Sequence, residues 1–369
     1  MSAKSLMAKL LKANKKDENV SVLADTGLLD KNVICSTTVP MIDVAWSGRP
    51  DGGIIPGIKM LVGDSRTFKT NFGLLDVKAY LDEFPDACCV FADSEFGANQ
   101  KYWESFGIDT NRVLHLPVVD VEMMKKRLAQ TLTALDPEDK VIVFIDSVSQ
   151  LPSRKEAEDA LTDKEAQDMT RARALNSFWR VITPIVNLHK WPLVWINSYY
   201  DSIGDKYAEK NIKGGKQGFL SSDAIWFITR SQEKGSDKEL IGWNFNINIM
   251  KGRFVREKAK IPVTVLYDQG IYRWSGMLEV CRYLGLIDMP TNGWYCVNEK
   301  AGFTEAGKKK GELKKRQKKD LDDDFWYAMM EQPNVIDAIT AFYSVSTGTL
   351  LSTPETERGM EKISEMATE

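Results

Sequence analysis

The sequence predicts an α/β fold: a mostly parallel sheet flanked by helices, with antiparallel strands along one edge. Three observations support this fold class. Apolar, β-branched runs alternate with amphipathic helical patterns through the first two thirds of the chain. One of these runs enters a glycine-opened turn that closes with Lys69-Thr70 at a helix start. Later runs alternate apolar and polar residues one by one, as half-buried antiparallel strands do.

The elements follow in order along the chain. A helix is expected at 3–14, and a β-rich stretch at 31–40 looks like a strand without an obvious partner in its own chain. In the core, strands are expected at 59–62, 88–92, 112–115, 141–145 and 192–197, and helices at 70–83, 99–106, 120–135 and 165–189. Antiparallel strands follow within 221–231, 242–252 and 260–274.

Changes in this pattern suggest four parts. We expect an oligomerisation arm at 1–40, a nucleotide-binding core at 41–275, a small C-terminal α/β region at 276–350 and a disordered tail at 351–369. The lysine-rich run at 308–319 is followed by four aspartates. Such a block is most often a solvated segment, and it either attracts duplex DNA or is neutralised by its own carboxylates.

Composition limits the function classes. The chain has 369 residues, 43% of them hydrophobic, and a net charge of −3, so a nucleic-acid site must be a local basic surface. No run approaches the ~20 apolar residues of a membrane span, and the N-terminus lacks an apolar signal region. We expect a soluble cytoplasmic protein that does not bind membranes. Five cysteines and two histidines lack metal-ligand spacing, which argues against a zinc site.

The stretch KMLVGDSRTFKT (59–70) is typical of a phosphate-binding loop between a strand and a helix. Lys69 would reach the β- and γ-phosphates of a nucleotide, and the Thr70 hydroxyl would bind Mg²⁺. Phe68 departs from the pattern, because a second glycine is usual at this position. The predicted nucleotide-binding residues here are Gly63, Asp64, Ser65, Arg66, Thr67, Phe68, Lys69, Thr70 and Asn71.

Carboxylates end two of the apolar strands. Asp146 closes VIVFID, at the sheet edge where α/β folds bind ligands, and could orient Mg²⁺. Asp93 and Glu95 follow the strand that begins near Cys88 and lie on the same side of an extended chain. Either could polarise an attacking water, and we favour Glu95.

A long polar, glycine-rich stretch at 199–219 is predicted to be neither helix nor strand. Long loops of this kind within compact domains are usually functional or disordered. This one combines cations that can follow a phosphate backbone with aromatic rings that can stack on bases, and so suits single-stranded DNA. The predicted contacts are Tyr199, Tyr200, Lys206, Tyr207, Lys210, Lys213, Lys216 and Phe219.

Several motifs together resemble a known family. VPMIDVAWSG, GGIIPG, LVGDSRTFKTNFGL, VFADSEFG, VIVFIDSVSQL, EAQDMTRAR, NIMKGRFVREK and NGWY occur in the order and spacing of the UvsX-like phage recombinases, a branch of the RecA strand-exchange family. The similarity covers residues 1 to about 350 and is closest over 37–150. It implies a DNA-dependent ATPase, with ATP and Mg²⁺ as cofactors, that forms a head-to-tail filament on single-stranded DNA. Duplex DNA, mediator proteins and single-strand-binding proteins are the implied partners.

The resemblance also implies roles for individual residues. Lys69 and Thr70 match the phosphate-loop pair, Asp146 the second carboxylate and Glu95 the water-activating glutamate; Phe68 is similar in the phage branch. Tyr102 lies where the family stacks a tyrosine on adenine, and Asn99 where bacterial RecA has an aspartate near the base. Lys251 and Arg253 match a cationic pair that reaches the neighbouring subunit's ATP. Ser198 replaces a longer polar residue, glutamine in RecA, thought to sense the γ-phosphate.

The family has a second DNA loop, which matches 153–169 here. That segment is acidic in balance, so its DNA-contact candidates are Arg154 and Lys155, with Lys164, Arg171 and Arg173 as further candidates. Two other function classes share the ATP site. One is a ring-shaped helicase-type motor with the same core. The other is an interaction protein that binds ATP without useful turnover because Phe68 spoils the loop.

Overall fold

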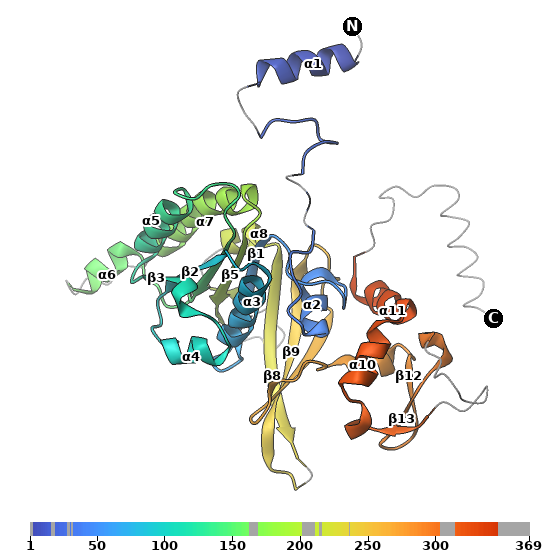
Figure 1. Ribbon diagram of the computed structural model, residues 1–369. Helices are drawn as coiled ribbons and strands as arrows, with labels where there is room; N and C mark the ends of the chain where they lie inside the picture. The colour runs from blue at the N-terminus through green and yellow to red at the C-terminus, as the bar shows by residue number, and fades with distance from the viewer. Residues whose placement is uncertain are drawn as a thin grey trace.

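The computed structural model describes residues 3–15, 19–27, 30, 32–161, 169–200, 211–213, 216–235, 237–302 and 314–345. Figure 1 shows an N-terminal helix away from the body, a large sheet with helices on both faces, and a small C-terminal region. The predicted fold class is confirmed. No described helix combines the length and apolar character that a membrane crossing requires.

The central sheet has nine strands in the order β11-β10-β9-β8-β1-β5-β4-β2-β3. The strands from β3 to β8 in this order are parallel, and those from β8 to β11 are antiparallel. Their bounds are β1 Gly57–Gly63, β2 Cys88–Asp93, β3 Val113–Pro117, β4 Val141–Asp146, β5 Pro192–Asn197, β8 Ala224–Lys234, β9 Leu240–Gly252, β10 Lys260–Leu266 and β11 Gly270–Ile271. The carboxyl ends of the parallel strands therefore meet at one edge.

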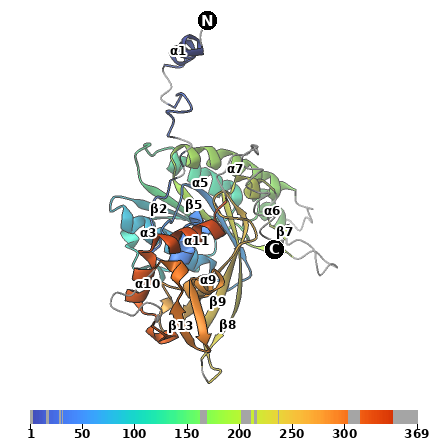
Figure 2. The ribbon, with the colours of Figure 1, turned by 90° about the vertical axis from the view of Figure 1, so that its right-hand side faces the viewer.

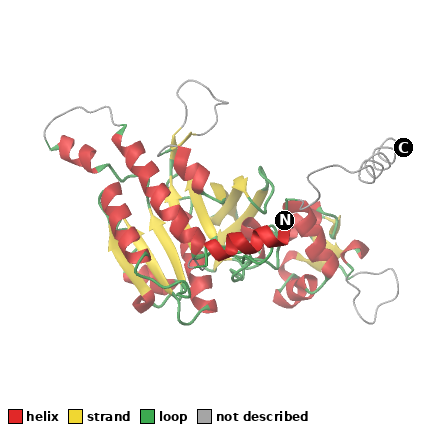
Figure 3. Ribbon diagram, turned by 90° about the horizontal axis from the view of Figure 1, so that it is seen from above, coloured by secondary structure: helices red, strands yellow, loops and turns green. Residues whose placement is uncertain are grey.

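Two layers of helices cover this sheet, and Figure 3 shows helices on both sides of the core strands. Alternate residues of β1 separate the layers: Met60 and Val62 belong to the cluster beneath α5 and α7, whereas Leu61 belongs to the cluster around α2 and α3. The core helices are α2 Pro40–Ser47, α3 Lys69–Glu83, α4 Gln100–Ser105, α5 Val121–Leu132, α6 Arg154–Ala160 and α7 Thr170–Leu188, with a short 3₁₀ turn η1 at Thr110–Arg112.

The N-terminal part differs from the prediction. Helix α1, Ala3–Ala13, is present and buries none of its residues. The stretch at 33–38 is not a strand: its pairing is one isolated bridge in which Ile34 N donates to Ile54 O and Ile54 N donates to Cys35 O. The chain then turns, because the Asp43 carboxylate accepts hydrogen bonds from the Thr37 amide and hydroxyl. The expectation of a strand without a partner in its own chain is wrong.

The described parts of the predicted loop at 199–219 contain regular structure. Its ends form a small antiparallel pair, β6 Tyr199–Tyr200 with β7 Asn211–Ile212, followed by helix α8, Lys216–Ser221. The prediction of neither helix nor strand is wrong at both ends, because the pairing joins residues far apart in the sequence. Residues 201–210 lie outside the described part of the chain.

The C-terminal region pairs short helices with a three-stranded antiparallel sheet, β12-β13-β14, and Figure 2 faces it. It is joined to the core, since Tyr343 Oη donates to Lys260 O at 3.2 Å and Trp274 Nε1 to Asp323 Oδ1 at 2.7 Å. Its elements are α9 Met277–Tyr283, β12 Ile287–Thr291, β13 Trp294–Val297, η2 Glu299–Ala301, β14 Arg316–Gln317, η3 Lys318–Asp320, α10 Asp323–Met330 and α11 Pro333–Tyr343.

Candidate nucleotide site and DNA-facing segments

An open cavity of about 1040 Å³ lies at the carboxyl edge of the parallel strands. The cavity brings together residues of the phosphate loop, of the segment after β2 and of the end of β4. The sequence predicted these three groups separately. Of the predicted site residues, the cavity is lined by Gly63, Ser65, Arg66, Thr67, Phe68, Lys69, Thr70, Asn71, Glu95, Tyr102, Asp146, Ser198 and Lys213.

The phosphate loop folds around the ammonium of Lys69. Lys69 Nζ donates to the carbonyl oxygens of Gly63 at 3.0 Å and Asp64 at 2.6 Å. Burial lowers the pKa of Lys69, while the charges of Asp146 and Glu95 oppose that shift. Gly63 is needed for close packing, because a Cβ there would lie 2.6 Å from the Ile228 carbonyl oxygen. The loop thus holds a cation where a nucleotide's phosphates would sit.

Phe68 takes the backbone conformation usual for a glycine. Its φ is 67° and its ψ 17°, in the left-handed region, immediately before α3. Its ring stacks on Phe245 with centroids 5.1 Å apart and meets Phe72 edge-on at 5.5 Å. These contacts hold the residue in place, so the departure from the glycine pattern does not disrupt the loop.

Thr70 and Asp146 provide oxygen ligands suited to Mg²⁺. Thr70 Oγ1 donates to Asp146 Oδ2 at 2.7 Å, across the gap between α3 and the end of β4. Burial raises the pKa of Asp146 to about 7, and the hydrogen bond from Thr70 opposes this. A hydroxyl and a carboxylate together fit a hard divalent cation, whose charge would also compensate the buried carboxylate.

The environments of Asp93 and Glu95 support the choice of Glu95 as the base. Asp93 is buried and already engaged: its Oδ1 accepts the amides of Glu95 and Phe96, and its Oδ2 lies 3.0 Å from His115 Nε2. Glu95 is exposed to the cavity, and its Oε1 accepts a hydrogen bond from Ser147 Oγ. Asp93 therefore shapes the turn that presents Glu95.

Tyr102 and Asn99 are predicted to lie near the nucleotide base, but only Tyr102 lines the cavity. Tyr102 lines it, and its hydroxyl hydrogen-bonds to Asn71 Oδ1. Asn99 does not line the cavity, because its side chain caps α4 by accepting the Tyr102 amide at 3.1 Å. Asn capping is common at helix starts and explains the difference.

Sequence reasoning missed one wall of the cavity, formed by Arg230, Trp243 and Tyr267. The Arg230 guanidinium lies 4.0 Å from the centre of the Trp243 ring, and Trp243 Nε1 donates to Tyr267 Oη at 2.9 Å. The sequence contains a signal for this wall, because Trp243 and Tyr267 are bulky aromatic residues at positions of the predicted antiparallel strands where polar residues are expected. Strand pairing brings these residues beside the phosphate loop.

Lys251 and Arg253 lie away from this cavity. Lys251 is paired with Ile225 of β8, and Ile225 is paired with Met60 of β1. Met60 lies three residues, roughly 10 Å, before Gly63, so Lys251 is set back from the phosphate loop by about this distance along the strands. Lys251 Nζ donates to the carbonyls of Phe219 and Leu220 at the end of α8. Arg253 forms an ion pair with the buried carboxylate of Asp223, although its own side chain is 60% exposed.

Comparison with known proteins decides the family. A model described as the RecA N-terminal domain matches residues 5–272. The chain belongs to the RecA family. A second model, described as the C-terminal domain of the bacteriophage T4 recombination and repair protein, matches residues 274–339. The motif-based resemblance to the phage branch of the family is confirmed.

Two relatives agree with this assignment in sequence. The recombination and repair protein of Enterobacteria phage T4 is 37% identical over 343 residues, covering 92% of this chain and 86% of that protein. Protein RecA of Aquifex aeolicus is 24% identical over 273 residues, covering 74% and 73%. A crystal structure of the RadB recombinase superposes with a TM-score of 0.48 and 14% identity, covering 64% of this chain and 98% of that one.

The candidate DNA contacts of this RecA-family chain are distributed unevenly. Lys206, Tyr207 and Lys210, and the Tyr200 side chain, lie outside the described residues. Lys216 is exposed at the start of α8, and Arg154 and Lys155 are exposed on α6. In contrast, the Tyr199 ring meets Phe227 edge-on at 4.9 Å and Phe219 packs near Lys251, so these two rings are engaged with their own chain.

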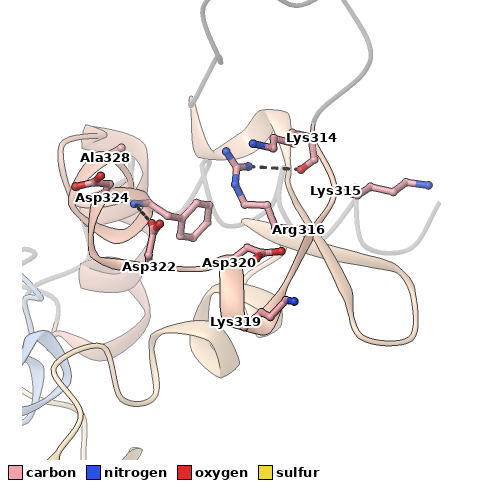
Figure 4. Close-up of a pocket in the computed structure, with 9 residues that line it drawn as sticks. Lys314, Lys315, Arg316, Lys319, Asp320, Asp322, Asp324 and Ala328 are labelled. Carbon is pink, nitrogen blue, oxygen red and sulfur yellow. Dashed lines mark hydrogen bonds between the residues drawn. The ribbon is translucent and has the colours of Figure 1, made fainter.

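The described part of the C-terminal charge block, from residue 314 onward, surrounds a second hollow of about 610 Å³, shown in Figure 4. Two of its aspartates serve the local fold: Asp322 Oδ1 accepts the Phe325 amide at the start of α10, and Asp320 Oδ2 accepts the Gln317 amide. The Arg316 guanidinium lies 5.2 Å from the Phe325 ring centre. The hollow is lined by Lys314, Lys315, Arg316, Lys319, Asp320, Asp322, Asp324, Phe325 and Ala328. Residues 303–313 are not described.

Proposed function

We propose that the chain is an ATP-dependent homologous recombinase. It assembles head to tail into helical filaments on single-stranded DNA and exchanges strands with duplex DNA in recombination, repair and recombination-dependent replication. Its partners are mediator and single-strand-binding proteins in the cytoplasm. The observation that carries the proposal is the convergence of Lys69, Thr70, Asp146 and Glu95 on one cavity in a RecA-family chain.

The chain's residues divide the work of hydrolysing ATP to ADP and phosphate. Mg²⁺, when bound, would supply positive charge beside the phosphates. Lys69 and the loop amides hold the β- and γ-phosphates, and Thr70 and Asp146 would hold the metal. Glu95 orients a water molecule and accepts its proton. Tyr102 packs against the base, and Asn71 fixes its hydroxyl.

Two substitutions test this chemistry. Lys69→Ala removes the cation that stabilises the phosphoryl-transfer transition state, so ATP turnover should fall by about a hundredfold or more. Glu95→Gln keeps the size but loses the basicity, so ATP should still bind while turnover falls by about a hundredfold. Steady-state ATPase rates with single-stranded DNA and nucleotide binding by fluorescence measure both effects.

Glu104→Gln is the matched control for Glu95→Gln, since Glu104 lies on α4, exposed, and bonds to Gln100 rather than facing the cavity. It should turn over ATP at the wild-type rate. Wild-type rates in Lys69→Ala and Glu95→Gln would refute the site.

Assembly separates the recombinase from the other two function classes. Electron microscopy of the protein with single-stranded DNA and a slowly hydrolysed ATP analogue should show open helical filaments. Closed rings would indicate the helicase-type motor. Nucleotide binding with neither assembly would indicate the non-motor interaction protein.

A further inference from the structure

A lysine that the sequence assigned to DNA lies at the nucleotide cavity instead. Lys213 follows β7, at the far end of the stretch that begins with Ser198, and both residues line the cavity with Glu95 and Asp146. Lys216, only three residues later, is exposed and does not line it. The lysines of this stretch therefore face two different surroundings.

The backbone at Lys213 is firmly attached to the end of β5. Lys213 N donates to Ser198 O at 3.0 Å, and Asn197 Nδ2 donates to Lys213 O at 2.8 Å. Asn197 is fully buried, and its Oδ1 accepts the Ser198 amide at 2.9 Å. Consequently both flanks of residues 201–210 are joined to one another at the rim of the cavity.

Ser198 cannot itself reach far into the cavity. Its hydroxyl oxygen is buried and has no hydrogen-bond partner among the described residues. A phosphate beyond the reach of this short side chain would need a longer cationic one. Lys213 has such a chain, and among the described residues its ammonium forms no hydrogen bond or ion pair.

We propose that Lys213 senses the terminal phosphate of bound ATP. Its ammonium pairs with the γ-phosphate, which a diphosphate lacks, and this contact ties the nucleotide to both flanks of the DNA-contacting stretch. The longer cation here takes over a task for which Ser198 is too short. This inference rests on the proposed function, since it assumes ATP in the cavity and DNA on the stretch at 199–219.

Thermodynamic linkage between nucleotide binding and DNA binding determines the expected result. If the γ-phosphate favours the DNA-binding arrangement through Lys213, then ATP must raise DNA affinity by the same factor by which DNA raises ATP affinity. A charge-assisted contact of this kind corresponds to about a tenfold to hundredfold change in affinity. Removing the charge should therefore weaken triphosphate binding and uncouple DNA from the nucleotide.

The test compares Lys213→Met with Lys216→Met, which removes an exposed charge from the same stretch. Affinity for a non-hydrolysable ATP analogue and for ADP is measured without DNA. Affinity for a labelled single-stranded oligonucleotide is then measured with each nucleotide. Lys213→Met should bind the analogue about tenfold or more weakly, bind ADP as the wild type does, and show nearly equal DNA affinity with either nucleotide.

Lys216→Met should instead weaken DNA binding equally with both nucleotides and keep their ratio. Lys213→Arg, which retains the charge, should keep both the analogue affinity and the ratio. If Lys213→Met behaves like Lys216→Met, Lys213 contacts DNA and the inference is wrong. If the wild type binds no DNA, the proposed function fails, and the analogue measurement alone still decides whether Lys213 contacts the γ-phosphate.

Discussion

At the scale of single residues, Phe68 shows how packing can replace a glycine. A left-handed backbone costs a non-glycine residue roughly 1–2 kcal/mol. The stacked ring of Phe245 and the edge-on ring of Phe72 offset this, since each aromatic pair contributes about 0.5–1.5 kcal/mol beyond its buried area. The residue that weakens the motif in the sequence is thus supported from β9 and α3.

This balance predicts an unusual order of stability at position 68. Phe68→Ala loses both ring contacts and still pays for the left-handed backbone, whereas Phe68→Gly loses only the contacts. We expect the free energy of unfolding of Phe68→Ala to be about 1 kcal/mol lower than that of Phe68→Gly. This is the reverse of the usual order of alanine and glycine inside helices. Urea denaturation of the two variants measures this. An alanine variant more stable than the glycine variant would show that the loop backbone rearranges.

Residues that follow predicted strands are the ones that the structure brings together in the cavity. Lys69, Asp146 and Glu95 each follow an apolar run, and parallel strands carry such positions to one edge whatever their order in the sheet. The wall of Trp243 and Tyr267 was missed because its position depends on the pairing of β9 with β8 and β10. Local patterns do not specify that pairing.

At the scale of elements, a buried ion pair joins the strand and the helix that flank the phosphate loop. Lys59 of β1 and Asp76 of α3 are both 0% exposed and form a salt bridge. The Lys59 ammonium lies 3.6 Å from the centre of the Trp46 ring, and Trp46 Nε1 donates to Asp76 Oδ1 at 3.0 Å. Burial lowers the pKa of Lys59 to about 7 and raises that of Asp76.

Removing one partner should be far more harmful than removing both. Lys59→Met leaves a buried carboxylate without its cation, so the free energy of unfolding should fall by about 3–5 kcal/mol. The double variant Lys59→Met/Asp76→Asn removes both charges and keeps an acceptor for Trp46, so it should regain most of that loss. Chemical denaturation of both variants gives the comparison.

The control pair lies on the same helix. Lys78 and Asp82 of α3 are 29% and 59% exposed, and neutralising both should change the free energy of unfolding by less than about 0.5 kcal/mol. A double variant at Lys59 and Asp76 no more stable than Lys59→Met would mean that the ion pair itself, rather than its burial, stabilises the contact between β1 and α3.

Element prediction failed where distant partners decide the structure. The stretch at 199–219 was judged by its glycines and polar residues, yet Tyr199 pairs with Ile212 and Lys216 begins α8. Conversely, the β-branched residues at 33–38 suggested a strand, but the Asp43 carboxylate draws this segment into a turn. Side-chain hydrogen bonds of Ser, Thr and Asp compete with ladder pairing in this way.

At the scale of the whole molecule, Lys251, Arg253 and α1 favour a contact between copies of the chain. Lys251 and Arg253 are set back from their own phosphate loop, and α1 exposes the apolar side chains of Leu6, Met7 and Leu10. A head-to-tail contact would cover the apolar face of α1 and place Lys251 and Arg253 against a neighbouring subunit, and such a heterologous contact forms an open helix when its rotation does not close. The cations would then reach the ATP of the neighbouring subunit.

A trans role for Lys251 predicts complementation between two inactive proteins. Lys251→Ala and Lys69→Ala should each hydrolyse little ATP alone. In a mixed filament, some interfaces place the intact phosphate loop of the first variant against the intact Lys251 of the second. Random equal mixing makes about a quarter of the interfaces of this kind, so ATPase activity should rise to roughly a quarter of the wild-type rate.

The control mixes Lys251→Ala with the double variant Lys69→Ala/Lys251→Ala, in which no interface contains an intact Lys251, so activity should stay low. Fluorescence transfer between labelled subunits confirms that the two proteins share filaments. If they share filaments and the first mixture stays inactive, Lys251 does not act on the neighbour's ATP. Its contacts to the Phe219 and Leu220 carbonyls would then be its function, because they fix the end of α8 within the same subunit.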